Sequence, residues 1–295
     1  MDFHLNSGDI FAILTALCWS SGVILFHVSG RILGSLQIST LKNIIGVIGF
    51  IGFLAVQRNE FPVFTHHEIW TMVISGTLGV AVGDLLFLSS LRRLGAGLNA
   101  IVSTSYTPTI FLLAFFMFGE IISLQAYCGG VLVIVGIVIG TIEIPKNRSR
   151  GDISRGVIYG FSAQALTAFS VLLLKPIMEI HPVVPIALVR FTTGAVLSIG
   201  FLAFTKGSSA FIDTIKQGFK HPPLIMGSIL GTFLSVIFWL AGYKYTLAGR
   251  AAIYNQLSTI FIIIMAAIFL KEAMTRRKWL AVTCALSGAL LVSAY

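Results

Sequence analysis

Charged residues are scarce in this sequence. They make up 11% of the 295 residues, while 56% are hydrophobic, and an ordinary soluble domain has about 25% charged residues. Such a chain has too little polar surface to cover itself in water. Apolar runs of roughly 20 residues recur along its whole length, and this is the length that an α-helix needs to cross the hydrocarbon of a bilayer. The composition therefore excludes a soluble protein and predicts a membrane protein.

Several signatures of other functions are also missing. The net charge of +9 comes from Lys and Arg residues scattered singly or in pairs, so it predicts no basic face for nucleic acid. No phosphate-binding loop, nucleophile with its base or set of spaced metal ligands occurs. Adjacent His66 and His67 point in different directions, and Cys18, Cys128 and Cys284 lie in apolar runs as small hydrophobes. The sequence thus predicts no enzyme, no cofactor and no metal.

The apolar runs predict an all-α polytopic membrane protein. An isolated strand would leave its backbone hydrogen bonds unmade in hydrocarbon, and the runs lack the alternation of a membrane barrel. Bounded by charges, Pro or Gly, the ten predicted spans are 9–28, 37–56, 69–91, 97–118, 124–143, 153–174, 184–205, 224–243, 249–270 and 278–295.

The chain divides at its midpoint into two similar halves. A polar stretch at 144–155 reads as a linker between a first unit at 1–143 and a second at 156–295. Each unit holds five spans, and an odd number makes the second unit enter the membrane from the opposite side. We therefore expect two inverted repeats, the arrangement that many secondary transporters use for alternating access.

Matching residues support the duplication. A shift of 148 residues places Lys42 over Arg190, and a shift of 152 places Gly79 over Gly231 and Glu120 over Glu272. Small apolar residues alone produce chance matches in membrane proteins, but here the order of the features repeats as well. The two Glu residues close the fourth and ninth spans, where we expect a structural role in capping or bridging the next helix.

Two segments resemble the drug/metabolite transporter superfamily, in particular its ten-span permeases with two EamA-type domains. They are "GDLLFLSSLRRLGAGLNAIVSTSYTPTIFLLAFFMFGE" at 83–120, followed by "GGVLVIVGIVIG" at 129–140, and "WLAGYKYTLAGRAAIYNQLSTIFIIIMAAIFLKE" at 239–272, followed by the Gly288 stretch. One departure is Ile260, which stands where the first half has Pro108. The resemblance implies a transporter of amino acids, other metabolites or drugs without identifying which.

Ionisable residues inside spans are the most informative features for a site, because each costs at least about 2.5–3.5 kcal/mol at mid-bilayer. Lys42, Asp84 and Arg190 qualify. Asp84 can neutralise one cation, and the position matching Asp84 in the second half is Val236, so one positive charge is left over. This charge predicts a docking point for a carboxylate or phosphate. The alternative is that Lys42 and Arg190 snorkel to the interface.

Asp84 has two interpretations. As a buried carboxylate it would suit proton coupling, which makes protons a candidate coupling ion. As the partner of Lys42 it would be structural. Aromatic and polar residues of the spans could complete a central cavity, although each could instead be a helix contact or an interfacial anchor. The full set of predicted cavity residues is Trp19, Lys42, Asp84, Phe87, Tyr106, Gln164, Arg190, Trp239, Tyr243, Tyr254, Asn255 and Gln256.

These features predict a secondary transporter of small organic metabolites, such as amino acids or other amphipathic solutes, in a cell membrane of the bacterial inner-membrane type. A non-transporting scaffold or helper subunit is the alternative. The expected partners are the substrate and the lipid bilayer, for a monomer or a homodimer. Basic residues between spans number fourteen on the side opposite the N-terminus and four on the N-terminal side. Both termini are therefore predicted to lie outside the cell.

Overall fold

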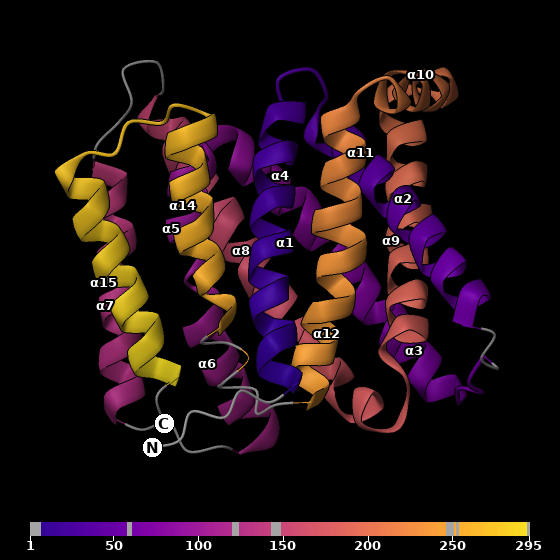
Figure 1. The fold of residues 1–295 in the computed structure, drawn as a ribbon, viewed down its shortest axis with the longest axis horizontal. Coiled ribbons are helices and arrows are strands. Elements are labelled where there is room, and N and C mark those ends of the chain that lie inside the picture. Colours follow the sequence, from indigo (N-terminus) through magenta and orange to yellow (C-terminus); the bar gives the residue numbers. More distant parts are fainter. Residues whose placement is uncertain are drawn as a thin grey trace.

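The computed structural model of the protein describes residues 7–57, 61–119, 124–142, 149–245, 251 and 254–293. Helices dominate the described residues, and no strand occurs among them (Figure 1). The helices of the first half are α1 (Ser7–Ser29), α2 (Ser35–Gln57), α3 (His66–Ser75), the π-helix η1 (Gly76–Gly83), α4 (Asp84–Leu94), α5 (Ala96–Ser103), α6 (Tyr106–Phe118) and α7 (Leu124–Ile142). Those of the second half are α8 (Arg150–Ile180), α9 (Val183–Lys206), α10 (Ser208–Phe219), α11 (Pro222–Ser228), the π-helix η2 (Ile229–Leu234), α12 (Ser235–Tyr245), α14 (Leu257–Phe269) and α15 (Arg276–Ser293).

These helices make the ten predicted spans. Seven segments of the described chain are long and apolar enough to cross a membrane, among them the continuous segments His66–Leu94, Ala96–Met117 and Pro222–Tyr245, each built from two or three helices. The other three predicted spans correspond to α7 and α14, which contain the shorter apolar stretches Tyr127–Gly140 and Leu257–Phe269, and to α15. The prediction of an all-α polytopic protein is confirmed, and most observed ends lie within a few residues of the predicted ones.

The two halves run in opposite senses. Helix α1 begins at the end of the bundle where α15 finishes, whereas α8 begins at the other end (Figure 1). Repeat-related spans also pack against each other: α2 contacts α9, α5 of the fourth span contacts α14 of the ninth, and α7 contacts α15. The last pair meets at matching glycines. A Cβ on Gly136 would stand 2.7 Å from the Ala285 nitrogen, and one on Gly288 would stand 2.6 Å from the Gly129 oxygen.

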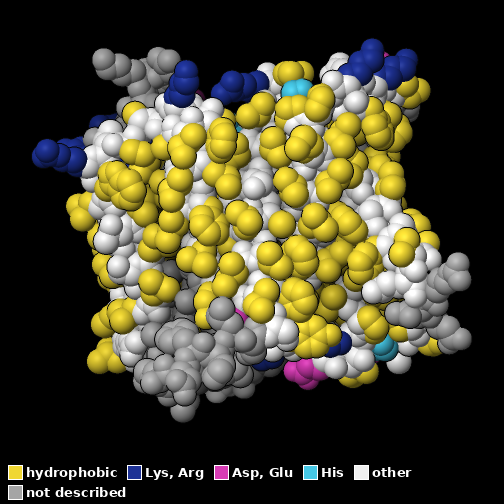
Figure 2. Space-filling model, viewed as in Figure 1, with side chains coloured by type: hydrophobic (Ala, Val, Ile, Leu, Met, Phe, Trp, Pro, Cys, Tyr) yellow, Lys and Arg dark blue, Asp and Glu magenta, His cyan; other side chains and the backbone are white. Residues whose placement is uncertain are grey.

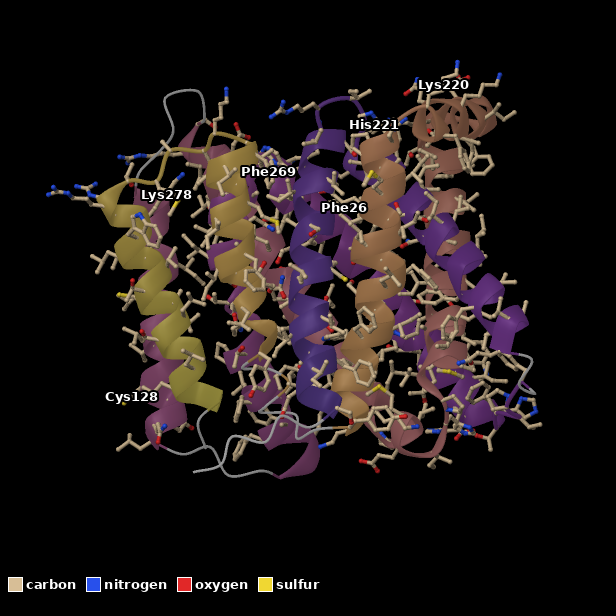
Figure 3. All side chains as sticks on the ribbon, in the orientation of Figure 1. Phe26, Cys128, Lys220, His221, Phe269 and Lys278 are labelled. Atoms are coloured by element: carbon tan, nitrogen blue, oxygen red, sulfur yellow. The ribbon has the colours of Figure 1, made fainter. Side chains whose placement is uncertain are left out.

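Lys and Arg residues gather at one end of the bundle, which we call the basic face. It carries Lys220, His221 and Lys278, while Cys128 lies at the opposite face (Figure 3). Between the two faces the surface is largely hydrophobic, as the yellow band in Figure 2 shows. This distribution fits a protein whose middle contacts lipid tails and whose ends contact water.

Irregular helical turns occur at matching places in both repeats. The π-helices η1 and η2 interrupt the third and eighth spans. The fourth span breaks at Thr104, where the Thr107 N–H bonds to the Thr104 oxygen at 3.3 Å, and the Thr259 N–H bonds likewise to the Gln256 oxygen at 3.0 Å. The break thus recurs 152 residues later although Ile260 replaces Pro108. The missing proline does not make the repeats differ here.

Helix α10 was not predicted. It lies across the end of α9 at the basic face instead of along the bundle (Figure 1). The Gln37 amide donates a hydrogen bond to the Thr214 hydroxyl at 3.0 Å, and Gly218 lies so close to Leu41 that a Cβ there would stand 2.3 Å from a Leu41 methyl. One face of α10 is therefore fixed against α2.

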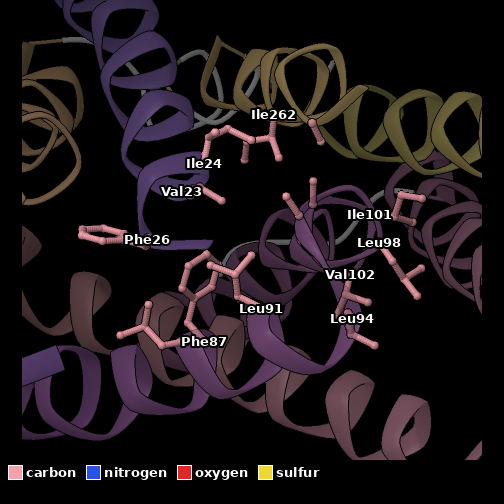
Figure 4. Close-up of a cluster of buried hydrophobic side chains, with 14 of the residues drawn as sticks. Val23, Ile24, Phe26, Phe87, Leu91, Leu94, Leu98, Ile101, Val102 and Ile262 are labelled. Carbon is pink, nitrogen blue, oxygen red and sulfur yellow. The ribbon is translucent and has the colours of Figure 1, made fainter. Parts of the chain in front are cut away.

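A cluster of apolar side chains fills the bundle on the side of the basic face. It joins α1, α4 and α5 of the first repeat to α14 of the second, with Val23, Phe87, Leu91 and Ile262 among its members (Figure 4). The Glu272 carboxylate lies beyond this cluster and accepts the backbone N–H groups of α5 at its first two residues, at 2.9 and 3.1 Å. Glu272 thus has a structural capping role, as expected, but the helix it caps is α5 of the other repeat and not the next helix along the chain. Glu120 lies outside the described residues.

Candidate functional site

A cavity of about 170 Å³ lies in the middle of the bundle, between the repeats. Helices α1, α5, α6, α8, α9, α12 and α14 contribute to it, together with the η1–α4 segment. The residues that line it are Thr15, Ala16, Trp19, Gly79, Val80, Asp84, Phe87, Ser103, Tyr106, Gln164, Thr167, Arg190, Phe191, Ser235, Val236, Trp239, Asn255, Gln256, Ser258 and Thr259. Asp84 directly follows η1, the matching Val236 is the second residue after η2, and both line the cavity.

Arg190 is the cation of this cavity. Its side chain is 2% exposed and does not snorkel to an interface. One terminal nitrogen donates to the Ser170 hydroxyl at 3.2 Å, and the guanidinium carbon lies 5.8 Å from the centre of the Trp239 ring. The Nε atom has no hydrogen-bond partner, and no carboxylate lies within ion-pair distance among the described residues. Arg190 therefore has a free donor and no ion-pair partner among the described residues, although the negative charge of Asp84 also acts on it.

Asp84 and Lys42 form a buried ion pair. The ammonium group of Lys42 also donates to the Asn43 amide oxygen at 3.1 Å and lies 5.5 Å from the centre of the Phe191 ring. The Asp84 side chain is 19% exposed and reaches the cavity, whereas Lys42 lies behind it. The ion pair neutralises Lys42, one of the two interior cations, as the sequence predicted. Arg190 is the interior cation that remains without an ion-pair partner among the described residues.

Aromatic rings form much of the apolar wall. The rings of Trp19 and Phe87 lie 5.3 Å apart between their centres, joining α1 to α4. Trp239 packs edge-on against Tyr243 at 5.6 Å, and the Tyr243 hydroxyl lies 3.2 Å from the hydroxyl of Tyr106. The two tyrosines connect the repeats across α6 and α12. Rings beside a cation suit a solute that carries both an apolar part and a charged group.

The predicted amide side chains differ in whether their polar atoms have hydrogen-bond partners. Gln164 donates to the Ser103 hydroxyl at 3.1 Å, and Gln256 donates to Thr107. The Asn255 amide has neither its nitrogen nor its oxygen hydrogen-bonded to a described residue. An unsatisfied buried amide needs water or a solute as a partner. Asn255 is therefore a second polar group at the cavity, besides Arg190, without a well-formed hydrogen bond, and its polar neighbour is the Tyr243 side chain.

The structure brings most of the predicted residues to one cavity, with exceptions. Nine of them line it, while Lys42 and Tyr243 stand behind Asp84 and Tyr106, and Tyr254 is half-buried outside the lining. The sequence prediction missed the small hydroxyl residues, such as Thr15 and Ser235. A signal was available, because each stands four residues before a predicted tryptophan and so shares its helix face.

The described residues contain no group of three or more His, Cys, Asp or Glu that could hold a metal ion. Glu68 instead caps α3 through Thr65 and pairs with His181 at the end of α8, at 2.9 Å. This pair lies at the face opposite the basic one and joins the two repeats, because Glu68 belongs to the first and His181 to the second. Within the second repeat, Lys244 also donates to the His181 carbonyl oxygen at 2.9 Å.

Ten helical spans in two inverted repeats around a central cavity define a polytopic membrane transport protein. The pattern of the EamA-like transporter family matches the chain twice, over residues 6–142 and 154–294. The chain therefore belongs to the EamA-like transporter family, and it is a transporter and not an enzyme. An uncharacterized transporter of Archaeoglobus fulgidus is 24% identical over 272 residues, which cover 91% of each chain. A solved crystal structure superposes with a TM-score of 0.68 at 13% identity, covering 97% of this chain and 96% of the other, so it shows the same fold.

Proposed function

We propose that the protein is a secondary transporter in a cell membrane that carries a small organic acid with an apolar part, amino acids included, by alternating access. One observation carries the substrate class. Arg190 is a buried guanidinium at the cavity that has a free donor and no acid to pair with among the described residues. Burying such a charge is costly without a partner, and the carboxylate or phosphate of a substrate supplies one.

Binding assays test this substrate class. A thermal-shift screen of the detergent-solubilised protein against amino acids, sugar phosphates, nucleosides and cationic drugs identifies a ligand that stabilises the folded chain. Arg190→Gln should then weaken binding of an acidic ligand at least about tenfold, because a charge-assisted hydrogen bond is lost. A neutral analogue of the ligand should lose much less. Arg155→Gln removes an exposed charge from α8 and serves as the control. Equal losses for acid and neutral analogue would contradict the proposal.

Transport assays test the cavity itself. Trp239→Ala and Tyr106→Ala each remove an aromatic wall residue and should reduce uptake into liposomes while folded protein is retained. Phe204→Ala, on α9 but 88% exposed toward the lipid, is a matched aromatic control that should transport normally. If both cavity variants keep the kinetics of the original protein, the solute uses a different surface.

Alternating access requires the apolar cluster beside the basic face to separate. On α1, α4 and α14 the cavity residues come before the cluster residues along the chain, so the cluster lies between the cavity and the basic face. The π-helices directly before Asp84 and Ser235 are candidate hinges, since such irregular turns occur at functional sites. Cysteines replacing Ile24 and Ile262, neighbours in Figure 4, should block transport when joined by a short thiol cross-linker. Unchanged transport after cross-linking would contradict this opening.

Asp84 is the candidate proton carrier. Asp84→Asn should abolish any stimulation of uptake by a pH gradient if protons are coupled through it.

A protein that moves no solute in liposomes and co-purifies with one partner would favour the alternative function, a scaffold or helper subunit.

A further inference from the structure

Helix α10 has two different outward surfaces. Thr214 and Gly218 face α2 and are buried, and Ile212 and Phe219 are each 55% exposed along one edge. Lys216, at the helical position beyond that edge, is exposed as well. A helix that is fixed by one face, apolar along an adjacent edge and basic beyond it has the pattern of an interfacial helix lying at the boundary of tails and headgroups.

The basic residues around α10 have no partners among the described residues. Lys206 ends α9, Lys220 follows α10, and neither these two nor Lys216 makes a hydrogen bond or ion pair through its side chain with the described residues. Asp213 is the acid of this segment. Figure 2 shows the resulting cluster of Lys and Arg side chains over the α10 end of the basic face. A net positive surface at headgroup depth is attracted to anionic lipids.

Two cations also converge beside the first residue of α2. The ammonium nitrogen of Lys206 and a guanidinium nitrogen of Arg92 lie 3.9 and 4.0 Å from the point where a Cβ on Gly34 would stand. The two cations therefore lie at most about 8 Å from each other, the sum of these two distances, and repel. No described acid lies within ion-pair distance of either. Arg31, exposed in the same loop, adds a third cation. An anion bound by these groups would relieve the repulsion.

We propose that α10, Lys206, Arg92 and Arg31 form a docking surface for the phosphate headgroups of anionic phospholipids. The lipid phosphates lie against the cations, and Ile212 and Phe219 enter the adjacent acyl region. A lipid is favoured over a soluble anion because the cations stand next to the apolar edge of a helix at the end of a hydrophobic bundle. This surface is independent of the transported solute and of the central cavity.

Lipid selectivity of the full-length protein tests the surface. The relative association constant of spin-labelled phosphatidylglycerol over phosphatidylcholine is measured in proteoliposomes for the original protein and for the triple variant Lys206→Gln, Lys216→Gln, Lys220→Gln. The triple variant should lose selectivity, by at most about fivefold for each lysine. A matched control is Arg276→Gln, Arg277→Gln, Lys278→Gln, which removes three charges of the same face at the start of α15. Equal losses in both variants, or no loss in the first, would overturn the proposal.

The depth of α10 provides a second measurement that does not depend on lysine substitutions. In a background with the three native cysteines replaced, spin labels are placed at positions 212 and 217. The label at 212 should be the more accessible to oxygen, which concentrates in lipid, and the label at 217 to a water-soluble nickel chelate. Equal accessibility of both labels to the chelate would place α10 in water and overturn the proposal. Displacement of labelled lipid by inorganic phosphate at matched ionic strength would assign the site to a soluble anion instead.

Discussion

Lys42 and Arg190 occupy matching positions in the two repeats and meet different neighbours. Asp84 pairs with Lys42, and the residue that matches Asp84 is Val236, which offers Arg190 no charge. The sequence alone predicted this imbalance, because it follows from a count of ionisable residues in the spans. It could not predict the contacts of Arg190 with Ser170 and Trp239. These depend on which helices touch, and a single sequence does not contain that information.

The ion pair makes a testable prediction at this scale. Asp84→Asn leaves the ammonium group of Lys42 buried without its partner, so the free energy of unfolding should fall by about 3 kcal/mol. Adding Lys42→Met removes the stranded charge and should restore much of the loss. Thermal unfolding of the purified variants in detergent measures both effects. If the double variant is as unstable as the sum of the two single ones, the two residues are not coupled.

At the scale of elements, the long apolar spans were predictable from the sequence, whereas the π-helices and the short helix α10 were not. The spans follow from hydropathy, which reflects the solvent around the helix. A π-helical turn holds one more residue than an α-helical turn, and the packing of neighbouring helices decides where it forms. The sequences of η1 and η2 contain glycines, but so do other spans, so these two turns could not be predicted. Helix α10 was missed because the stretch 208–219 is too short and too polar to be a span, and so was assigned to a loop.

Close packing between α1 and η2 leads to the prediction for this scale. A Cβ on Gly22 would stand 2.4 Å from the Cα of Gly231, and backbone atoms cannot move aside as side chains do. Gly22→Ala should therefore destabilise the fold by about 1–3 kcal/mol. Gly52→Ala is the control, since nothing lies within 4 Å of a Cβ at that position. Thermal unfolding compares the two variants, and equal midpoints would contradict the close contact between α1 and η2.

At the scale of the whole molecule, the asymmetry of charge between the two faces predicts how the protein sits in the membrane. The fourteen basic residues predicted on the side opposite the N-terminus are Arg31, Arg92, Arg93, Lys146, Arg148, Arg150, Arg155, Lys206, Lys216, Lys220, Lys271, Arg276, Arg277 and Lys278. The four on the N-terminal side are Arg58, Lys175, Lys244 and Arg250. The structure describes twelve of the fourteen and two of the four, and Figure 2 shows Lys and Arg gathered at the basic face.

Short loops rich in Lys and Arg stay in the cytoplasm during insertion, so the basic face should be cytoplasmic and both termini should face outward. The lipid proposal agrees with this orientation, because the cytoplasmic leaflet carries a negative surface potential that attracts basic segments such as α10. A reporter that fluoresces only when it folds in the cytoplasm, fused after Tyr295, should remain dark. The same reporter inserted after Gly207, between α9 and α10, should be bright if the protein remains folded. A bright fusion after Tyr295 together with a dark insertion after Gly207 would reverse the orientation, and α10 would then face the outer leaflet.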